Sequence, residues 1–358
     1  MKFQNPVYAS WKKKQSTKIE KGLTYMCYKE EKHRRLSINL AEKLKDIPSF
    51  IADFFDRYKS AATKNCNWGY IRDLLQWLIE RKYIAKENVS DITPKDMDAV
   101  TSNHIIKYLN DLKDGITCRR NSLDSICTKK NVFSAFWNYM FLNKYVNDNI
   151  IRHIPGHLYK SEITQKEVKI PTDKQVRDFL DNIDNEKSGE FTIMRNTSIV
   201  KLILGSGIRS EELINLDVDD LHLNAKRPYI MVLGKGNIEQ KDKVFISLQA
   251  MDTMREYMKK RRKFLADKFE TEKAVFISER MGRLSKTPIT SFFDRYSHGE
   301  INPHMLRHWV GSELYKNTKD IVLVQRQLRH KDLETAARYY VHIDESVIAD
   351  SMAEMKVS

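Results

Sequence analysis

The feature that most constrains the fold is the spacing of apolar residues between Ile47 and Tyr145, where glycine is scarce. Apolar side chains recur there every three or four positions, which places them on one face of an α-helix. One such face, between Asn67 and Ile84, consists of Ile71, Leu74, Leu75, Leu78 and Ile79. Three more helices are expected near 49–61, 102–112 and 122–142. The region predicts a small helical bundle.

A different pattern follows this bundle. Residues 151–172 contain two prolines, one glycine and little periodicity, which is typical of a linker between domains. Thr172 is a suitable N-cap for a helix that runs to Ile183, and a second apolar helix is expected over 191–204. Residues 227–248 predict two short β-strands joined by a glycine-containing turn, and helices resume at Ala250, with a short strand expected over 274–277. The fold class is therefore mainly α with a small β-sheet.

Positive charge is concentrated in the first half of the chain. The 358 residues carry 62 basic and 48 acidic side chains, a formal net charge of +14. Residues 1–160 hold 29 basic and 17 acidic side chains, whereas 161–358 hold 33 and 31. Such asymmetry indicates a polyanionic partner, and nucleic acid is favoured over a membrane surface. A lysine-rich surface that only promotes solubility is the alternative.

Four basic residues lie at or near the start of the helix expected over 122–142, where backbone N–H groups also favour a phosphate. They are candidate DNA contacts, although a solvated charged face explains each of them equally well. These residues are Arg119, Arg120, Lys129 and Lys130.

Several classes of protein are disfavoured. No run approaches the roughly 18 apolar residues that a membrane span needs, and the basic N-terminus lacks the apolar stretch of a signal peptide. We therefore expect no membrane association and a cytoplasmic location. The four cysteines are scattered without C-x-x-C spacing, which argues against a zinc ribbon and a disulfide framework.

Two candidate functional residues lie next to glycines. Arg209 follows a glycine-rich turn in LGSGIRSEEL, and its guanidinium offers a rigid fork for phosphate oxygens. Lys235 lies in the predicted hairpin turn, LGKGN, where an ammonium group can protonate a leaving oxygen. Either residue alone is a weak signal, because a lysine in a hairpin turn is usually only solvated.

Two further clusters contain histidine. His304 and Arg307 are three positions apart in HMLRH and share one helical face, so both can donate to one phosphate. His304 and His308 lack the H-E-x-x-H pattern of a zinc site, so no metal is predicted. His330 precedes Tyr339 and Tyr340 by nine and ten residues, and a tyrosine can attack phosphorus as a nucleophile.

Together these residue types suit phosphoryl transfer without a metal, because cationic donors can neutralise the charge of a pentavalent phosphate. Their order and spacing resemble the tyrosine recombinases, the family of phage integrases and Xer-type recombinases. Arg209 lies in a G-x-R-x-x-E-L box with Glu212, Lys235 in a G-K-G-N signature, and His304 and Arg307 form H-x-x-R. The likeness covers about 165–345 by motif.

The sequence departs from the family pattern at one position and is ambiguous at another. Arg329 replaces the usual glycine before the second histidine, His330, and should modify the site without abolishing it. The nucleophile of the family lies nine or ten residues beyond that histidine. The context Y-V-H-I-D that begins at Tyr340 favours it, with Tyr339 as the alternative.

The resemblance implies a site-specific recombinase or integrase that cleaves and rejoins double-stranded DNA at a specific site through a 3'-phosphotyrosyl link. By this likeness Tyr340 is the nucleophile, Arg209 and Arg307 clamp the phosphate, His304 and His330 hydrogen-bond it, and Lys235 protonates the leaving oxygen. No cofactor is implied, and four protomers act together. The alternatives are a type IB topoisomerase and a DNA-binding protein that has lost catalysis.

The resemblance also assigns the parts of the chain. It implies a basic N-terminal segment over 1–45, a helical, SAM-like core-binding domain over 46–155 and a linker over 156–170. A mixed α/β catalytic domain is expected over 171–343, and a tail over 344–358 that contacts a neighbouring protomer.

Overall fold

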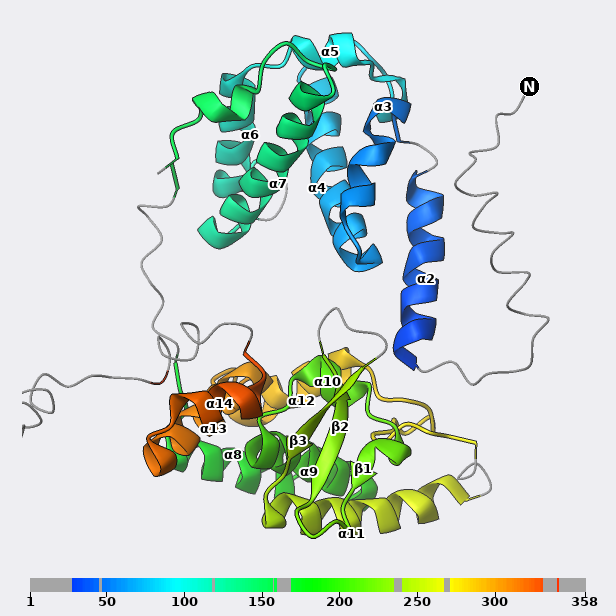
Figure 1. Cartoon of the computed structure of the whole chain (residues 1–358), viewed down its shortest axis with the longest axis vertical. Helices are drawn as coiled ribbons and strands as arrows, with labels where there is room; N and C mark the ends of the chain where they lie inside the picture. The colour runs from blue at the N-terminus through cyan, green and yellow to red at the C-terminus, as the bar shows by residue number, and fades with distance from the viewer. Residues whose placement is uncertain are drawn as a thin grey trace, which may run out of the picture. The chain divides into compact units, whose positions relative to one another are not determined.

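The computed structural model describes residues 28–44, 47–117, 120–156, 158–159, 169–234, 240–266, 271–330 and 340. The chain divides into two compact units, residues 1–166 and 167–358, and each has its own hydrophobic core. Figure 1 colours them from blue to green and from green to red. None of the described helices is both long and apolar enough to cross a membrane.

The first unit is a helical bundle, as predicted. Its elements are α2 (Tyr28–Lys43), α3 (Ser49–Ala52), η2 (Asp53–Arg57), α4 (Ala61–Glu80), η3 (Val89–Asp91), α5 (Pro94–Asp98), α6 (Ser102–Asp114), α7 (Leu123–Leu142) and η4 (Ile150–His153). Ile71, Leu74, Leu75 and Leu78 of α4 are fully buried in the core, whereas Ile79 is partly buried and packs against it. The periodic apolar face of the sequence therefore packs inward.

Two features of this bundle differ from the expected pattern. The helix expected over 49–61 is split, because α3 passes into the 3-10 helix η2 and Ser60 then caps α4 by accepting a hydrogen bond from the backbone N–H of Thr63 at 3.4 Å. In addition, α2 lies within the predicted N-terminal segment and packs against α4, with Leu40 buried. The bundle thus includes residues that precede 46.

The second unit surrounds one central helix. Its elements are α8 (Asp173–Asp184), α9 (Glu190–Ser206), α10 (Ser210–Ile214), η5 (Val218–Asp220), β1 (Leu221–His222), β2 (Tyr229–Leu233), β3 (Lys241–Phe245), α11 (Leu248–Leu265), α12 (Lys286–Ser297), α13 (Pro303–Thr318) and α14 (Ile321–Leu328). The residues Ile199, Val200, Leu202 and Ile203 are fully buried and cover more than one face of α9. Accordingly, α8, α11 and α13 all pack against α9.

The sheet is antiparallel and small, with strand order β1-β2-β3 (Figure 1). Tyr229 pairs with Phe245 and Leu233 with Lys241, so β2 and β3 form the predicted hairpin. Thr172 caps α8 as expected, since its hydroxyl accepts from the backbone N–H of Gln175. The predicted fold class, mainly α with a small sheet, is confirmed.

The strand expected over 274–277 was wrong. These residues are buried, but they form only two isolated bridges, Asp217 with Ala274 and Ile277 with Arg283. The Arg283 guanidinium donates to the carbonyls of Ile214 and Leu216 at 2.8 and 3.0 Å. The backbone N–H of Val275 still donates to the same Leu216 carbonyl at 3.0 Å. The carbonyls of Ala274 and Val275, however, accept from the side chains of Arg261 and Tyr257, so no continuous ladder forms.

Candidate active site

Arg209 is placed by the turn between α9 and α10. Gly207 ends α9 with a φ of 69°, and a Cβ there would lie 2.3 Å from Leu328 Cδ2, so this turn requires glycine. Arg209 then caps α10, and its backbone N–H donates to Glu212 Oε2 at 2.9 Å. Its guanidinium donates to Glu212 Oε1 at 2.8 Å. The turn at Gly207 thus sets the direction of the arginine side chain.

Arg307 is held on α13 beneath this turn. Asn302 caps α13 by accepting hydrogen bonds from the backbone N–H groups of His304 and Met305, both at 3.0 Å. Arg307 is 1 % exposed and donates to the carbonyls of Gly207 and Leu328. Burial lowers its pKa to about 9, and the neighbouring Arg209 adds to this effect. Arg307 therefore joins the end of α9 to the end of α14.

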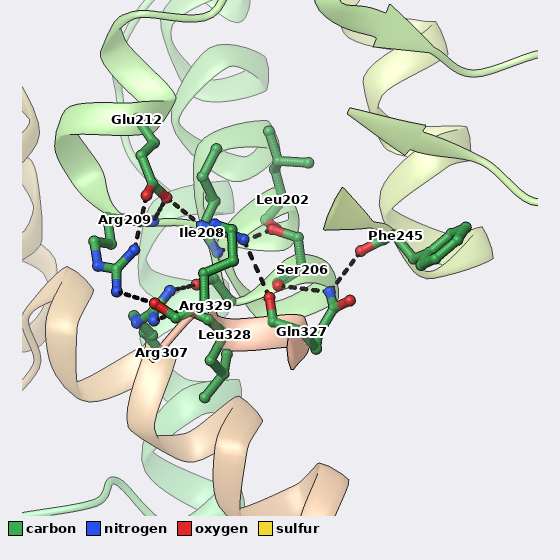
Figure 2. Close-up of polar contacts among 11 residues, drawn as sticks. Leu202, Ser206, Ile208, Arg209, Glu212, Phe245, Arg307, Gln327, Leu328 and Arg329 are labelled. Atoms are coloured by element: carbon green, nitrogen blue, oxygen red, sulfur yellow. Dashed lines mark hydrogen bonds and ion pairs between the residues drawn. The ribbon is translucent and has the colours of Figure 1, made fainter. Parts of the chain in front are cut away.

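Both arginines donate hydrogen bonds to carbonyl groups at the end of α14 (Figure 2). Arg307 donates to the carbonyl of Leu328, and Arg209 donates to the next carbonyl, that of Arg329, at 2.9 Å. Carbonyls at a helix C-terminus carry partial negative charge and favour cations. Arg209 and Arg307, which are almost a hundred positions apart in the sequence, thus donate to adjacent carbonyl groups.

Gln327 fixes α14 against the rest of the unit. Its side-chain amide donates to the carbonyl of Ser206 at 2.9 Å and to that of Phe245 at 2.8 Å, as Figure 2 shows. One side chain thereby joins the end of α9, the end of β3 and α14. These bonds hold the acceptor carbonyls of α14 in register with the Arg209 turn.

Tyr340 lies among histidines. Its hydroxyl is 3.0 Å from His308 Nδ1, and its ring stacks on that of His330 with centroids 5.9 Å apart and planes 13° apart. The His304 ring meets the His308 ring edge to face, with centroids at 4.5 Å. The side chain of Tyr340 is 3 % exposed. The structure therefore brings His304, His330 and Tyr340 together, as the sequence predicts.

Gly311 provides the space for the Tyr340 ring. A Cβ at Gly311 would lie 2.4 Å from Cζ, 2.6 Å from Cε1 and 2.8 Å from the hydroxyl oxygen of Tyr340. Real carbon atoms do not approach so closely, so only glycine allows the ring to lie against α13. Sequence reasoning missed Gly311 as a site residue, because a helical glycine gives no sign of the side chain that covers it.

The histidines are poised as neutral groups. Burial lowers the pKa of His308 to about 4, and the neighbouring His304 and Arg307 add to this effect. Burial likewise lowers the pKa of His330 to about 4, with contributions from Arg307 and Arg209. Burial also lowers the pKa of His304, with Arg307 and Arg209 adding to the effect. Near pH 7 these imidazoles are neutral, so each has one ring nitrogen that can accept a hydrogen bond. His308 was considered in the sequence only as a metal ligand, and its contact with Tyr340 was not foreseen.

Three predicted residues lie outside the described residues. Lys235, the predicted proton donor, Tyr339, the alternative nucleophile, and Arg119, a candidate DNA contact, are among them. Their roles remain predictions. Within the described residues, no group of three His, Cys, Asp or Glu side chains is placed to hold a metal ion.

The other candidate DNA contacts differ in exposure. Arg120 is exposed and donates to the carbonyl of Lys113 at 3.1 Å, and Lys130 donates to that of Pro155 at 2.8 Å. Lys129 is only 8 % exposed. Its ammonium donates to Asn121 Oδ1 at 3.0 Å and lies 5.4 Å from the ring centroid of Tyr70. Lys129 thus faces into the bundle, and its contact with a phosphate, like those of Arg120 and Lys130, stays a prediction.

Comparison with known proteins places this site in a family. Residues 170–346 match the phage integrase family. The chain is 27 % identical over 254 residues to tyrosine recombinase XerC of Psychromonas ingrahamii, covering 70 % of this chain and 77 % of that protein. It is 25 % identical to tyrosine recombinase XerS of Streptococcus uberis, covering 87 % of this chain and 96 % of that protein.

Solved structures show the same fold. The XerH site-specific recombinase, in a pre-cleavage complex with its difH substrate, aligns with a TM-score of 0.60 and 20 % identity over 84 % of this chain and 81 % of that one. A lambda integrase dimer bound to a COC' core site aligns with a TM-score of 0.58 and 16 % identity over 83 % and 98 %. With the arginine, histidine and tyrosine residues in family order and gathered at the end of α14, residues 170–346 form a domain of the phage integrase family of tyrosine recombinases.

Proposed function

We propose that the protein is a site-specific DNA recombinase that cleaves and rejoins strands of double-stranded DNA through a covalent 3'-phosphotyrosyl intermediate. The observation that carries this function is the convergence of Arg209, Arg307, His304, His330 and Tyr340 from four separate segments onto one site. Two arginine cations and neutral imidazoles beside a tyrosine hydroxyl suit attack on a phosphodiester.

In the proposed reaction, the Tyr340 oxygen forms a bond to phosphorus and the bond from phosphorus to the 5'-oxygen breaks. The tyrosine proton passes to a neutral imidazole, and His308 Nδ1, 3.0 Å from the hydroxyl, is the neighbour placed to accept it. Lys235 returns a proton to the leaving 5'-oxygen. Rejoining reverses these steps with the 5'-hydroxyl of another strand, so no external energy source is required.

The two arginines contribute differently in this proposal. The Arg209 side chain is 31 % exposed and presents the N–H groups not bound to Glu212 or Arg329 to a non-bridging oxygen. Arg307 is 1 % exposed, so it supplies positive charge from beneath and holds the two helix ends together. His304 and His330 hydrogen-bond the phosphate.

The parts of the chain have proposed roles as well. The bundle holds the duplex and consists of 46–155 together with α2. Arg120 and Lys130 contact phosphates of the DNA backbone. The linker over 156–170 joins the bundle to the catalytic domain over 171–343. The basic segment within 1–45 adds charge, and the tail, 344–358, docks on a neighbouring protomer of a tetramer. The protein acts in the cytoplasm, where its DNA target lies.

The test is the capture of a covalent DNA adduct. DNA sites are first selected from random or host fragments, and the wild-type protein is then incubated with a selected duplex that carries a nick near the cleavage point. A denaturing gel should show a protein–DNA adduct that Tyr340→Phe abolishes and Tyr339→Phe retains. Absence of any adduct with wild type would leave a DNA-binding protein without catalysis. An adduct with Tyr340→Phe but not with Tyr339→Phe would assign the nucleophile to Tyr339.

A further inference from the structure

Arg329 occupies a backbone position that favours glycine. It follows α14 with φ 54° and ψ 49°, in the left-handed region, where any side chain is disfavoured and glycine is not. Its side chain is nevertheless turned inward and is only 11 % exposed. A large cation at such a position is unfavourable for the backbone, so its contacts must compensate for this cost.

Those contacts lead to Arg209. The Arg329 guanidinium forms an ion pair with Glu212 Oε2 and donates to the carbonyl of Gln327 at 3.1 Å. Glu212 is 4 % exposed, and it also accepts the side chain of Arg209 at 2.8 Å and its backbone N–H at 2.9 Å. Figure 2 shows the single carboxylate between the two guanidinium groups. Glu212 is therefore fixed from both sides.

The main chain and the side chain of Arg329 contribute separately. Its carbonyl accepts from Arg209 at 2.9 Å, and any residue at this position can keep that bond. The ion pair with Glu212 needs a cationic side chain. With glycine, the carboxylate would be oriented by Arg209 alone and would partly neutralise it. With arginine, the three charges sum to +1 beside the phosphate position.

We propose that Arg329 is a positioning residue for Arg209: its guanidinium orients and neutralises the Glu212 carboxylate, which in turn holds the Arg209 fork toward the scissile phosphate. This role rests on the proposed function. A buried carboxylate shared by two guanidinium groups leaves Arg209 with one fixed orientation and a net positive field. The substitution of the family glycine thus adds a connection between the His330 segment and the Arg209 turn.

The experiment measures two quantities on the nicked duplex carrying the selected site: the single-turnover rate of adduct formation and the affinity of non-covalent binding. Arg329→Met removes the charge but keeps an extended, unbranched side chain. We expect it to bind the duplex as wild type does and to form the adduct about 10 to 100 times more slowly, as a misplaced catalytic group does. Arg329→Lys, which keeps the charge but not the fork, should recover part of the rate.

A double substitution tests the route through Glu212. In a Glu212→Gln background, Arg329→Met should slow adduct formation by less than about twofold further, because its effect passes through the missing carboxylate. If the two substitutions multiply, Arg329 does not act through Glu212 and the proposal is wrong. A wild-type rate for Arg329→Met or Arg329→Gly would also overturn it.

A matched control separates side-chain effects from backbone effects. Lys319 follows α13 in the same left-handed conformation, with a φ of 54°, but its side chain is exposed. Lys319→Gly makes the same backbone change as Arg329→Gly and should leave the adduct rate unchanged. If the wild-type protein itself forms no adduct, the proposed function fails; an active wild type with fully active Arg329 variants refutes the positioning role alone.

Discussion

His308 shows how one residue links the site to pH. Burial, together with the nearby charges of His304 and Arg307, lowers its pKa to about 4 from an ordinary 6.5. Between these two values the unfolded chain binds more protons than the folded one. The free energy of unfolding therefore falls as the pH drops from about 6.5 toward 4, and it is insensitive to this group above that window.

Replacing His308 by asparagine should reduce this pH dependence. Asparagine keeps a polar atom near the Tyr340 hydroxyl but does not titrate, so His308→Asn should lose less melting temperature between pH 7 and pH 5 than wild type. Tyr340→Phe, which removes the same hydrogen bond and keeps the imidazole, should retain the wild-type pH dependence. Parallel melting curves of His308→Asn and wild type would contradict the buried neutral state of His308.

At the residue scale, the sequence identified the charged site residues and their order along the chain, but not which side chains contact one another. Arg209, His304, Arg307 and His330 were identifiable because their spacing follows a family pattern. The contact of His308 with Tyr340 depends on how α13 packs, which no local spacing encodes. The inward turn of Lys129 likewise depends on its tertiary neighbours, Asn121 and Tyr70.

At the scale of elements, the fit of Tyr340 against α13 depends on one missing methyl group. The Gly311→Ala change places a Cβ within 2.4 Å of the Tyr340 ring. Overpacking of this kind costs about 1 to 3 kcal/mol, which exceeds the gain of about 1 kcal/mol from replacing a helical glycine. We expect Gly311→Ala to lower the free energy of unfolding in urea.

Gly69 offers the matched comparison. It lies inside α4, and a Cβ there would meet nothing within 4 Å, so Gly69→Ala should raise stability by up to about 1 kcal/mol. Tyr340→Ala is itself destabilising because it empties a buried site, but in that background Gly311→Ala should cost little further stability, since the ring it would clash with is absent. If Gly311→Ala stabilises the protein as Gly69→Ala does, the Tyr340 ring does not occupy this position.

Elements with strong local signals were predictable, and those that depend on partners were not. The apolar period locates α7 and the Thr172 cap locates α8, because both signals are local. The segment 274–277 has the composition of a strand, yet the side chains of Arg261 and Tyr257 occupy the carbonyls of Ala274 and Val275. Separate helices near 49–61 and from Asn67 were expected, but the end of the first at Arg57 and the start of α4 at Ala61, which the Ser60 cap sets, were not.

At the scale of the whole molecule, the charge distribution assigns DNA affinity mainly to the first half of the chain and catalysis to the second half. The first 160 residues carry twelve positive charges in excess and the remainder only two, as the counts of 29 against 17 and 33 against 31 show. Phosphate contacts by basic side chains release counterions, so binding weakens as salt rises, by about 0.9 in the logarithmic slope for each contact. The excess charge near the N-terminus should therefore dominate the slope.

The cluster Lys12, Lys13 and Lys14 tests this view. Deleting 1–45 would also remove α2, which packs against α4, so substitution is the cleaner change. Changing all three lysines to glutamine should reduce the slope of log affinity against log salt by up to about 3, measured on a duplex without a selected site. The matched control changes three exposed cations of α11, Lys259, Arg262 and Lys263, and should leave the slope unaltered. Equal slopes for both triple variants and wild type would show that the N-terminal lysines are solvated surface, and that grip on DNA arises from the bundle itself.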